Sequence, residues 1–440
     1  MTPRSPHPYI PNTDDDRHSM LDAIGIRGVD ELFVDIPGDF RIGGLNLPPA
    51  LPELDLTREM ASLAAQNIVA ANGVASFLGG GAYRHFIPST VGHIISRSEY
   101  YTAYTPYQPE ISQGTLQTMF ELQSMVCELT GMDVTNAGMY DGASALAEAC
   151  LMACRVTGRE RIAIHRSVNP AWLAVVRTYA HGPDLAVDVV DGGRLTEEHA
   201  CLAVQQPAFI GDLIDVWSLE EAAHGAGALC IAAVDPISLG ILTPPGEYGA
   251  DIVVAEGQSL GWPVNFGGPW FGLFACREEY VRQMPGRIVG RTTDLEGRTG
   301  YVLTLQTREQ HIRRERATSN ICTSQQLVGL AATVYLATVG KQGLRQIAEA
   351  CYQKAHYAAE LIDGLDGYSV DLQKPFFKEF VARCPRPPAE INYRLLERGI
   401  IGGLDVSDQV ENGMLLCVTE MNTREETERL VDGLREATHK

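Results

Sequence analysis

The stretch from Cys230 to Pro269, CIAAVDPISLGILTPPGEYGADIVVAEGQSLGWPVNFGGP, places polar side chains where two predicted strands end. An apolar run over residues 229–234 ends in Asp235. After several turn residues a second apolar run follows at 251–255, and the Gly- and Pro-rich loop behind it carries Ser259. Short uninterrupted apolar runs are typical of parallel strands that are buried on both faces. The stretch therefore combines a carboxylate at one strand end with a loop that leaves the next strand.

This combination is the one that pyridoxal-phosphate enzymes of fold type I use to hold their cofactor. In those enzymes the Asp pairs with the pyridinium nitrogen, and a Lys on the later loop forms the Schiff base. Here Ser259 stands about where that Lys is expected, and no lysine precedes residue 341. Arginine cannot replace it, because a guanidinium stays protonated and is no amine nucleophile. A chain of this fold would need a partner that supplies the lysine, or it is not the enzyme. The lysines are Lys341, Lys354, Lys374, Lys378 and Lys440.

Two further features of the expected cofactor region have more than one interpretation. Asp141-Gly142-Ala143-Ser144 precedes a predicted helix at 145–155, whose first amides could hold an anion such as a phosphate. Alternatively, Ser144 or Asp141 caps that helix. Asp235 is either a vestige of the pyridinium ligand or the acceptor of a structural hydrogen bond. The three glycines at 79–81 match no nucleotide-binding motif and are interpreted as allowing a close approach of the backbone.

Residues 99–114, EYYTAYTPYQPEISQG, form a segment that is unusually rich in tyrosine. Pro106 and Pro109 exclude a helix interior, so we expect an ordered loop. Tyrosines in such a loop either pack their rings beneath it, with their hydroxyls hydrogen-bonded, or line a pocket. The sequence leaves both possibilities open.

Residues 287–323 are dense in arginine and lead into Ala317-Thr318-Ser319-Asn320. One interpretation is a solvated, charged surface. The other is a functional interface near an active-site entrance, because arginine forks suit contacts with carboxylates and with other chains.

Three segments of the chain have different patterns. Residues 1–60 are predicted to form an arm, residues 61–325 a large α/β domain, and residues 326–440 a small α+β domain. In the large domain, strands at 161–165, 186–190 and 202–205 alternate with helices at 170–179 and 218–225. This alternation predicts a doubly wound, mostly parallel sheet. The small domain begins with helices at 324–339 and 344–363, separated near Gly340.

Three motifs, YTAYTPYQPEISQG, ELTGMDVTNAGMYDGASALAEA and LQTREQHIRRERATSNICT, resemble those of the glycine decarboxylase family, the P-protein of the glycine cleavage system. The resemblance runs from Tyr9 almost to the C-terminus and is to the first subunit of the family's split form. It implies the fold-type I transferase-like fold. In the family, the second half carries the Schiff-base Lys, and correspondence through GADIVVAEGQS puts Ser259 at that place. Arg316 stands where the family more often has Lys.

The resemblance implies that pyridoxal phosphate is held by the partner, glycine dehydrogenase subunit 2, with two copies of each subunit. The complex would decarboxylate glycine and pass the aminomethyl group to the lipoyl arm of the carrier H-protein. Candidates to line the partner's pocket are Tyr101, Tyr104, Thr105, Tyr107, Gln108, Glu110 and Gln113. Candidates for the interface or entrance are Arg313, Arg314, Thr318, Ser319 and Asn320. The vestigial cofactor positions are Asp235, Ser259 and Ser144.

Two alternatives remain. The chain is a non-catalytic scaffold or regulator of its partner, or it is a self-sufficient enzyme of another class. The second alternative lacks support, because no HExxH, CxxC or GxSxG motif occurs and no metal site is predicted.

Composition restricts the compartment and the partners. A formal net charge of −20 argues against nucleic acid and anionic membranes as partners. We find no apolar run of 18 residues, and the first residues lack the apolar core of a signal peptide. The 10 cysteines are scattered. These features predict a cytoplasmic protein with reduced thiols.

Overall fold

The structure is a computed structural model that describes residues 9–70, 73–192, 194–322 and 324–439. The chain divides into two compact units, Met1–Ile68 and Val69–Lys440, which are described separately. The first unit reaches eight residues beyond the predicted arm. It contains helices α1 (Asp14–Ile24) and α2 (Glu53–Ala64), and by itself it buries no described side chain. Helix α1 begins with a capping box, because the side chains of Thr13 and Asp16 each accept from the other's backbone amide.

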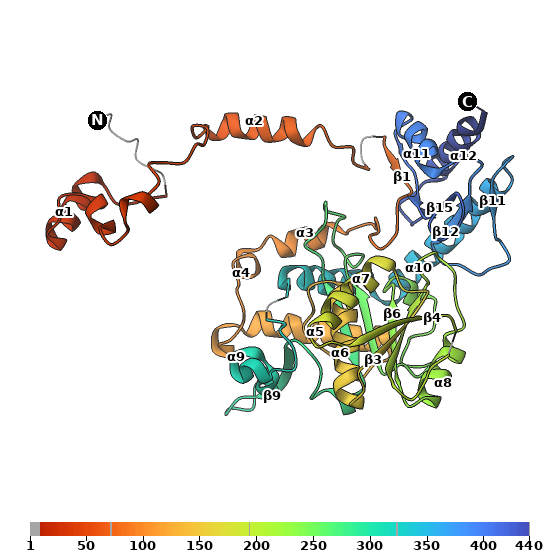
Figure 1. Ribbon diagram of the computed structural model, residues 1–440, viewed down its shortest axis with the longest axis horizontal. Helices are drawn as coiled ribbons and strands as arrows, with labels where there is room; N and C mark the ends of the chain where they lie inside the picture. The colour runs from red at the N-terminus through yellow and green to blue at the C-terminus, as the bar shows by residue number, and fades with distance from the viewer. Residues whose placement is uncertain (1–8, 71–72, 193, 323, 440) are drawn as a thin grey trace. The chain divides into compact units, whose positions relative to one another are not determined.

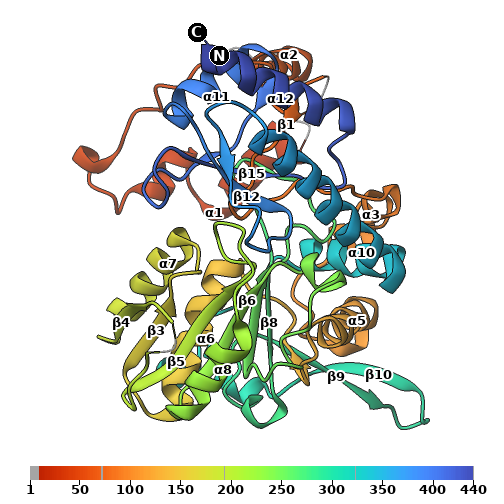
Figure 2. The ribbon, with the colours of Figure 1, turned by 90° about the vertical axis from the view of Figure 1, so that its right-hand side faces the viewer.

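The second unit is built on a seven-stranded sheet (Figures 1 and 2). The five strands from β7 to β4 run parallel, whereas β8 and β2 at the other end are antiparallel to their neighbours. This arrangement confirms the predicted mostly parallel sheet. In spatial order the strands are β2 (Val134–Thr135), β8 (Gly272–Cys276), β7 (Ile252–Glu256), β6 (Leu229–Val234), β5 (His199–Gln206), β3 (Arg161–His165) and β4 (Ala186–Val190).

Helices bury both faces of this sheet, which explains the continuous apolar runs. In β6, Ile231 and Ala233 join the core under α6 (Gly142–Thr157) and α7 (Pro170–His181). The alternate residues Ala232 and Val234 join the core on the opposite face. The helices on that opposite face are α5 (Gln113–Thr130), α8 (Val216–Gly225) and the first part of α10 (Gln326–Asp363).

A second, antiparallel sheet forms the small α+β layer predicted near the C-terminus (Figure 2). Its core includes buried residues of α10 and α12, and β1 and β13 pair beside it. The four strands are β11 (Ser369–Val370), β12 (Glu379–Arg383), β15 (Gly413–Cys417) and β14 (Leu404–Asp405). The remaining elements are α11 (Pro388–Glu397), α12 (Arg424–His439), β1 (Ala75–Ser76) and β13 (Ile400–Ile401).

Helix α10 runs past both sheets (Figure 2). Its helical geometry is interrupted at Gly340, where φ is 60°, so the break predicted between two helices is present. By length and composition α10 could cross a membrane, which the search for an apolar run of 18 residues did not anticipate. Half of its most apolar window is buried inside the protein, as is typical of a core helix.

The arginine-dense segment contains a hairpin that the sequence analysis missed. Strands β9 (Ile288–Thr293) and β10 (Thr299–Thr304) pair antiparallel, and residues near their connection are exposed. Three short helices complete the large layer: α3 (Ser89–Ile95), α4 (Ser98–Tyr101) and α9 (Gln310–Arg313).

Candidate functional site

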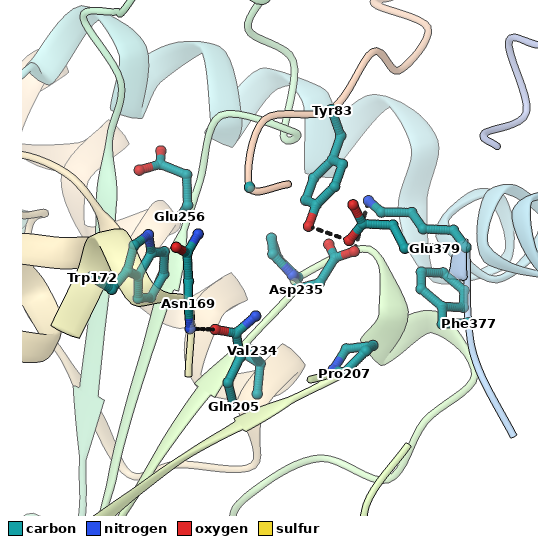
Figure 3. Close-up of a pocket in the computed structure, with 13 residues that line it drawn as sticks. Tyr83, Asn169, Trp172, Gln205, Pro207, Val234, Asp235, Glu256, Phe377 and Glu379 are labelled. Atoms are coloured by element: carbon teal, nitrogen blue, oxygen red, sulfur yellow. Dashed lines mark hydrogen bonds and ion pairs between the residues drawn. The ribbon is translucent and has the colours of Figure 1, made fainter. Parts of the chain in front are cut away.

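A cavity, here called the central cavity, lies where the carboxyl ends of β5, β6 and β7 face the beginning of β12 (Figure 3). Such strand ends are the usual place of ligand sites in open α/β sheets. Figure 3 shows Asp235 between two groups of side chains, Trp172 and Glu256 on one side and Tyr83 and Glu379 on the other. The lining residues are Gly81, Tyr83, Asn169, Trp172, Gln205, Pro207, Val234, Asp235, Pro236, Glu256, Phe377, Lys378 and Glu379.

Asp235 follows β6 directly, as predicted, and both of its carboxylate oxygens have partners. Oδ1 accepts a hydrogen bond of 3.0 Å from the amide of Ile237. Oδ2 lies 2.7 Å from Nζ of Lys378, whose side chain is 1% exposed, against 8% for that of Asp235. Lys378 immediately precedes β12, so this buried ion pair joins the two sheets.

The ammonium group of Lys378 has two further neighbours. Nζ lies 3.0 Å from Nε2 of His85 and 3.5 Å from the centre of the Tyr83 ring, a cation–π distance. Nδ1 of His85 lies 2.7 Å from Oε2 of Glu420. A neutral His85 satisfies both contacts, accepting from Lys378 at Nε2 and donating to Glu420 from Nδ1.

The ionisation of this network follows from burial and charge. Burial, helped by the positive charge of Lys378, lowers the pKa of His85, which keeps the ring neutral. Burial disfavours the charged form of Lys378, but the charge and hydrogen bond of Asp235, together with the nearby thiols of Cys417 and Cys351, hold the pKa of Lys378 above its ordinary value. Burial also opposes ionisation of Glu420, yet the hydrogen bond from His85 contributes to a pKa lowered to about 2.

His85, Cys351 and Glu420 place one ligand atom each within 4.8 Å of one another, which could suggest a metal site. Both ring nitrogens of His85 already have partners, and Lys378 brings a positive charge to one of them. The cluster is therefore better explained as part of the buried polar network.

Glu379 connects the network to the three-glycine segment. Its carboxylate accepts from the Tyr83 hydroxyl and from the amide of Gly80, each at 2.7 Å. Burial raises the pKa of Glu379 to about 6. A Cβ at Gly79 would lie 2.2 Å from Oε1 of Glu379, so the glycine permits the close approach that was predicted.

Glu256, the last residue of β7, accepts hydrogen bonds from three backbone amides. Oε2 accepts from Gly142 at 2.9 Å, and Oε1 accepts from Gln258 at 3.0 Å and Phe271 at 3.1 Å. Burial raises the pKa of Glu256 to about 7. Because Gly142 is the first residue of α6, the amide that could hold an anion is bonded to the chain's own carboxyl group.

Asp141 and Ser144 form a reciprocal capping box on α6. Ser144 donates its amide to Oδ1 of Asp141 at 2.7 Å, and Asp141 donates its amide to Oγ of Ser144 at 3.2 Å. Of the two interpretations of this motif, the capping one has its hydrogen bonds in place.

Ser259 lies buried on the loop after β7, and it is not among the residues that line the central cavity. Within the described part of the chain, its Oγ has no hydrogen-bond partner. The side chain of the preceding Gln258 makes two hydrogen bonds to the backbone of Tyr83. It accepts from the amide at 2.8 Å and donates to the carbonyl at 2.9 Å.

The segment 99–114, here called the tyrosine loop, is not a loop throughout as predicted, because residues 99–101 belong to α4 and Gln113 begins α5. Three of its four tyrosines are exposed, and Tyr107, at 47%, is the least exposed of the three. Tyr101 is 68% and Tyr104 79% exposed, and with Thr105 they line a surface pocket beside Trp262 and the beginning of α10. Tyr107 differs, because its hydroxyl accepts a hydrogen bond of 3.1 Å from Arg287. Of the two interpretations of the loop, the pocket-lining one describes Tyr101 and Tyr104.

The remaining candidates of the loop divide into two kinds. Gln108 and Glu110 are exposed. Gln113 bonds to both the amide and the carbonyl of Tyr301 in β10, at 2.9 and 2.8 Å, and so fastens the end of the loop to the hairpin.

The arginine-dense segment contains both buried and exposed members. Arg308 is buried and donates to the carbonyls of Met284, Gly286 and Leu305. Arg287 is also buried, 3.7 Å from the carboxylate of Glu309. These two arginines therefore support the fold.

The candidates at the proposed entrance lie on the surface next to Arg287. Arg314 and Asn320 line a cleft that Arg287 also lines, whereas Arg313 is exposed beside it. Thr318 donates to the carbonyl of Arg308 at 3.3 Å, and Ser319 Oγ accepts from the amide of Ile321 at 3.0 Å. Through its contacts with Tyr107, Arg287 brings the tyrosine loop and this segment together.

Four residues that line the central cavity were missed by sequence reasoning, namely Tyr83, Glu256, Lys378 and Glu379, as was His85, which contacts Lys378. Lys378 had one recognisable signal, because it interrupts the apolar run PFFKEFVA that contains the beginning of β12. A lysine within such a run requires a buried partner of opposite charge.

Comparisons with known proteins identify the family. The family described as Glycine cleavage system P-protein matches residues 7–434. A protein of Thermomicrobium roseum named probable glycine dehydrogenase (decarboxylating) subunit 1 is 52% identical, over 98% of this chain and 99% of its own length.

Two solved structures are similar in fold. A crystal structure of glycine decarboxylase (P-protein) of the glycine cleavage system, in inhibitor-bound form, is 44% identical with a TM-score of 0.93, covering 98% of this chain and 100% of that one. A sphingosine-1-phosphate lyase of Burkholderia pseudomallei has a TM-score of 0.64 at 16% identity, over 91% of this chain and 94% of that one. The second likeness supports the fold class alone.

Proposed function

The chain belongs to the glycine cleavage system P-protein family, and from this premise we propose that it is subunit 1 of a two-subunit glycine dehydrogenase (decarboxylating). The observation that carries the proposal is a match over nearly the full length of both chains to proteins of that name. Its partner is then subunit 2, with two copies of each subunit. The complex decarboxylates glycine and passes the aminomethyl group to the lipoyl arm of the H-protein, in the cytoplasm.

The proposal puts pyridoxal phosphate on the partner. Ser259 stands where the resemblance expects the Schiff-base lysine, and serine cannot form that bond. The cofactor supplies an electron sink while carbon dioxide leaves glycine. The acceptor of the aminomethyl group is a disulfide, so no nicotinamide is required.

The role of this chain in the proposal is to complete the partner's pocket with the tyrosine loop. Tyr101 and Tyr104 offer exposed hydroxyls and rings that can orient a small substrate and exclude water. Hydrogen bonds fix the loop at Tyr107, to Arg287, and at Gln113, to Tyr301. These bonds hold the C-terminal half of the loop in place. Thr105, Gln108 and Glu110 are the other candidates for contacts with the partner.

Arg313, Arg314, Thr318, Ser319 and Asn320 would lie at the entrance of the shared site. Arg314 and Asn320 support this assignment, because they line a cleft that continues to Arg287 and so to the base of the tyrosine loop. An exposed guanidinium suits a carboxylate on glycine or on the incoming carrier protein.

The test is Tyr101→Phe in the assembled complex, with glycine turnover as the measurement. If the hydroxyl orients substrate, we expect kcat/KM for glycine to fall by about tenfold, the value of one hydrogen bond of about 1.4 kcal/mol. Tyr393→Phe on α11 is the matched control, since Tyr393 is also 68% exposed. An unchanged KM and kcat in Tyr101→Phe would show that the loop is structural.

A second candidate function is that of a non-catalytic scaffold that stabilises the catalytic partner. It is favoured by the ion pair of Lys378 and Asp235, which uses the predicted cofactor ligand for a structural purpose. A scaffold predicts normal kinetics for every tyrosine-loop variant that still assembles with the partner.

A further inference from the structure

We propose that this chain fills its own cofactor cavity with side chains, Lys378 opposite Asp235 and Glu256 at the beginning of α6, and that it therefore binds no pyridoxal phosphate. The proposal concerns the central cavity alone and holds whether or not the complex acts on glycine. It also assigns these side chains a task, which is to hold the small sheet against the large one without any ligand.

The first cofactor group whose place is taken by a side chain is the pyridinium ring. An Asp at this strand end stabilises a protonated ring nitrogen through its negative charge. In this chain the ammonium of Lys378 supplies the positive charge, with Nζ 2.7 Å from Oδ2 of Asp235. The face of Tyr83 and the ring of His85 complete the surroundings of the ammonium. A cofactor ring would have to displace a paired, buried charge.

The second cofactor group whose place is taken by a side chain is the phosphate. A phosphate at a helix N-terminus is held by free backbone amides. Here Glu256 accepts from Gly142 and from two amides of the following loop, which leaves these three donors satisfied. Space is lacking as well, because a Cβ at Gly142 would already lie 2.5 Å from the ring of Trp172.

The remaining free space supports the same conclusion. Inside the central cavity it amounts to about 30 Å³, which is roughly the room of one water molecule. Pockets that bind small molecules commonly have volumes of about 300 Å³ or more. A phosphorylated pyridine therefore cannot enter unless side chains leave.

The side chains that fill the cavity come from segments next to both sheets, so their contacts can hold the two sheets together. Glu379 begins β12 of the small sheet and Lys378 precedes it directly, Asp235 follows β6 of the large sheet, and Tyr83 lies between β1 and α3. The ion pair thus crosses the junction between the sheets, and the bond from Tyr83 fastens Glu379 to the segment between β1 and α3. The chain holds this junction closed with its own charges.

The test uses pyridoxamine 5′-phosphate, which has no aldehyde and cannot react with surface lysines. Fluorescence titration of the full-length chain should show no saturable binding for the wild type. The double variant Lys378→Ala/Glu256→Ala frees Asp235 and three amides, and it should show saturable binding at a ligand concentration at least about tenfold below the highest one at which the wild type shows none. Lys374→Ala, which removes an exposed lysine four positions away, should behave as the wild type.

If the double variant does not fold, Lys378→Gln removes the charge while retaining most of the volume, and it should show the same direction of change. A folded variant that binds no better than the wild type would overturn the assignment of these side chains. Saturable binding to the wild-type chain would overturn it as well.

A count of cofactor in the assembled complex provides an independent measurement. We expect one equivalent of pyridoxal phosphate per pair of subunits, and two equivalents would contradict the proposal. The count separates this inference from the proposed function, because a complex without glycine turnover can still hold one equivalent.

Discussion

The central cavity and the tyrosine loop use the same residue types in opposite ways. In the cavity, the hydroxyl of Tyr83 donates to Glu379 and its ring lies against Lys378, so both ends of the side chain are engaged inside the protein. On the loop, Tyr101 and Tyr104 leave most of their surface to solvent. Tyr107 lies between these extremes, because its hydroxyl is bonded to Arg287 and its ring is partly exposed.

The difference separates stability from recognition. Buried charges destabilise a fold unless each has a partner, so the cavity network has to be complete within the chain. Exposed aromatic rings contribute little to the fold, but they offer large and rigid contact areas to another molecule. Changes in the cavity should therefore alter the stability of this chain, and changes in the loop should alter its binding to the partner subunit.

The largest effect is expected from Lys378→Met, which leaves the buried carboxylate of Asp235 without its counter-charge. Removing one member of a buried ion pair costs about 3–5 kcal/mol, and we expect that loss in the free energy of unfolding from urea titration of the full chain. Asp235→Asn/Lys378→Met removes both charges and should restore most of the loss.

The matched control is Lys374→Met. Lys374 lies 3.4 Å from Asp212 but is largely exposed, so its removal should cost about 1 kcal/mol or less. Equal losses for the two lysines would contradict the contrast between a buried junction and a solvated surface.

The sequence located the strands of the large sheet well, because their signal is local. Apolar runs bounded by turn residues gave β3, β4 and β6 with their observed bounds, and they placed Asp235 at the end of β6. The capping boxes of α1 and α12 are likewise local, because each joins residues only three positions apart. Each of these features depends on neighbours along the chain.

The partners of Asp235 could not be found in that way, because they come from distant segments. Lys378 lies in another sheet, and no periodicity relates it to residue 235. The hairpin of β9 and β10 was missed for a different reason. Its strands carry Arg291 and several threonines, and their residues near the connection are exposed, so they lack the apolar alternation that marks a buried strand.

The second prediction concerns pH and the buried carboxyl group of Glu256. Burial, with a contribution from Asp141, raises its pKa from the ordinary value of 4.5 to about 7. Between these values the folded state binds more protons than the unfolded state, so stability falls as pH rises from 4.5 to 7 and then levels off. The contribution is on the order of 3 kcal/mol.

Glu256→Gln should remove this fall, because an amide does not titrate. The measurement is the free energy of unfolding of both proteins at pH 5, 6, 7 and 8, and the difference between them should change over that range. Glu379, with a pKa of about 6, is present in both proteins and cancels. The exposed Glu247→Gln is the control, and a Glu256→Gln curve parallel to that of the wild type would refute the prediction.

A third, smaller effect is expected from changes in the exposed tyrosine loop. Tyr101→Ala/Tyr104→Ala removes two exposed rings and should weaken binding of the partner subunit by about 10- to 100-fold. The unfolding free energy of the chain alone should change by less than about 0.5 kcal/mol, as is usual for surface positions. Titration calorimetry with the partner gives the affinity, and Tyr393→Ala is the control.

If this double variant binds the partner normally but is itself destabilised, then the loop belongs with the cavity and the division into stability and recognition fails. Normal binding together with normal stability would leave the loop without an energetic role at the interface. Its exposed tyrosines would then have to act on substrate, which the turnover of Tyr101→Phe measures directly.

The smallest effect is expected from two buried serines that differ in their hydrogen bonds. Ser238 donates its hydroxyl to the carbonyl of Asp235 at 2.7 Å, whereas Ser259 Oγ has no partner within the described part of the chain. Removing a satisfied hydroxyl costs about 1 kcal/mol, while removing an unsatisfied one is close to neutral or stabilising. Ser238→Ala should therefore lower the urea midpoint, and Ser259→Ala should leave it unchanged or raise it. A clear loss in Ser259→Ala would mean that its hydroxyl has a partner after all, and that the loop after β7 still holds something at the place where the family's lysine is expected.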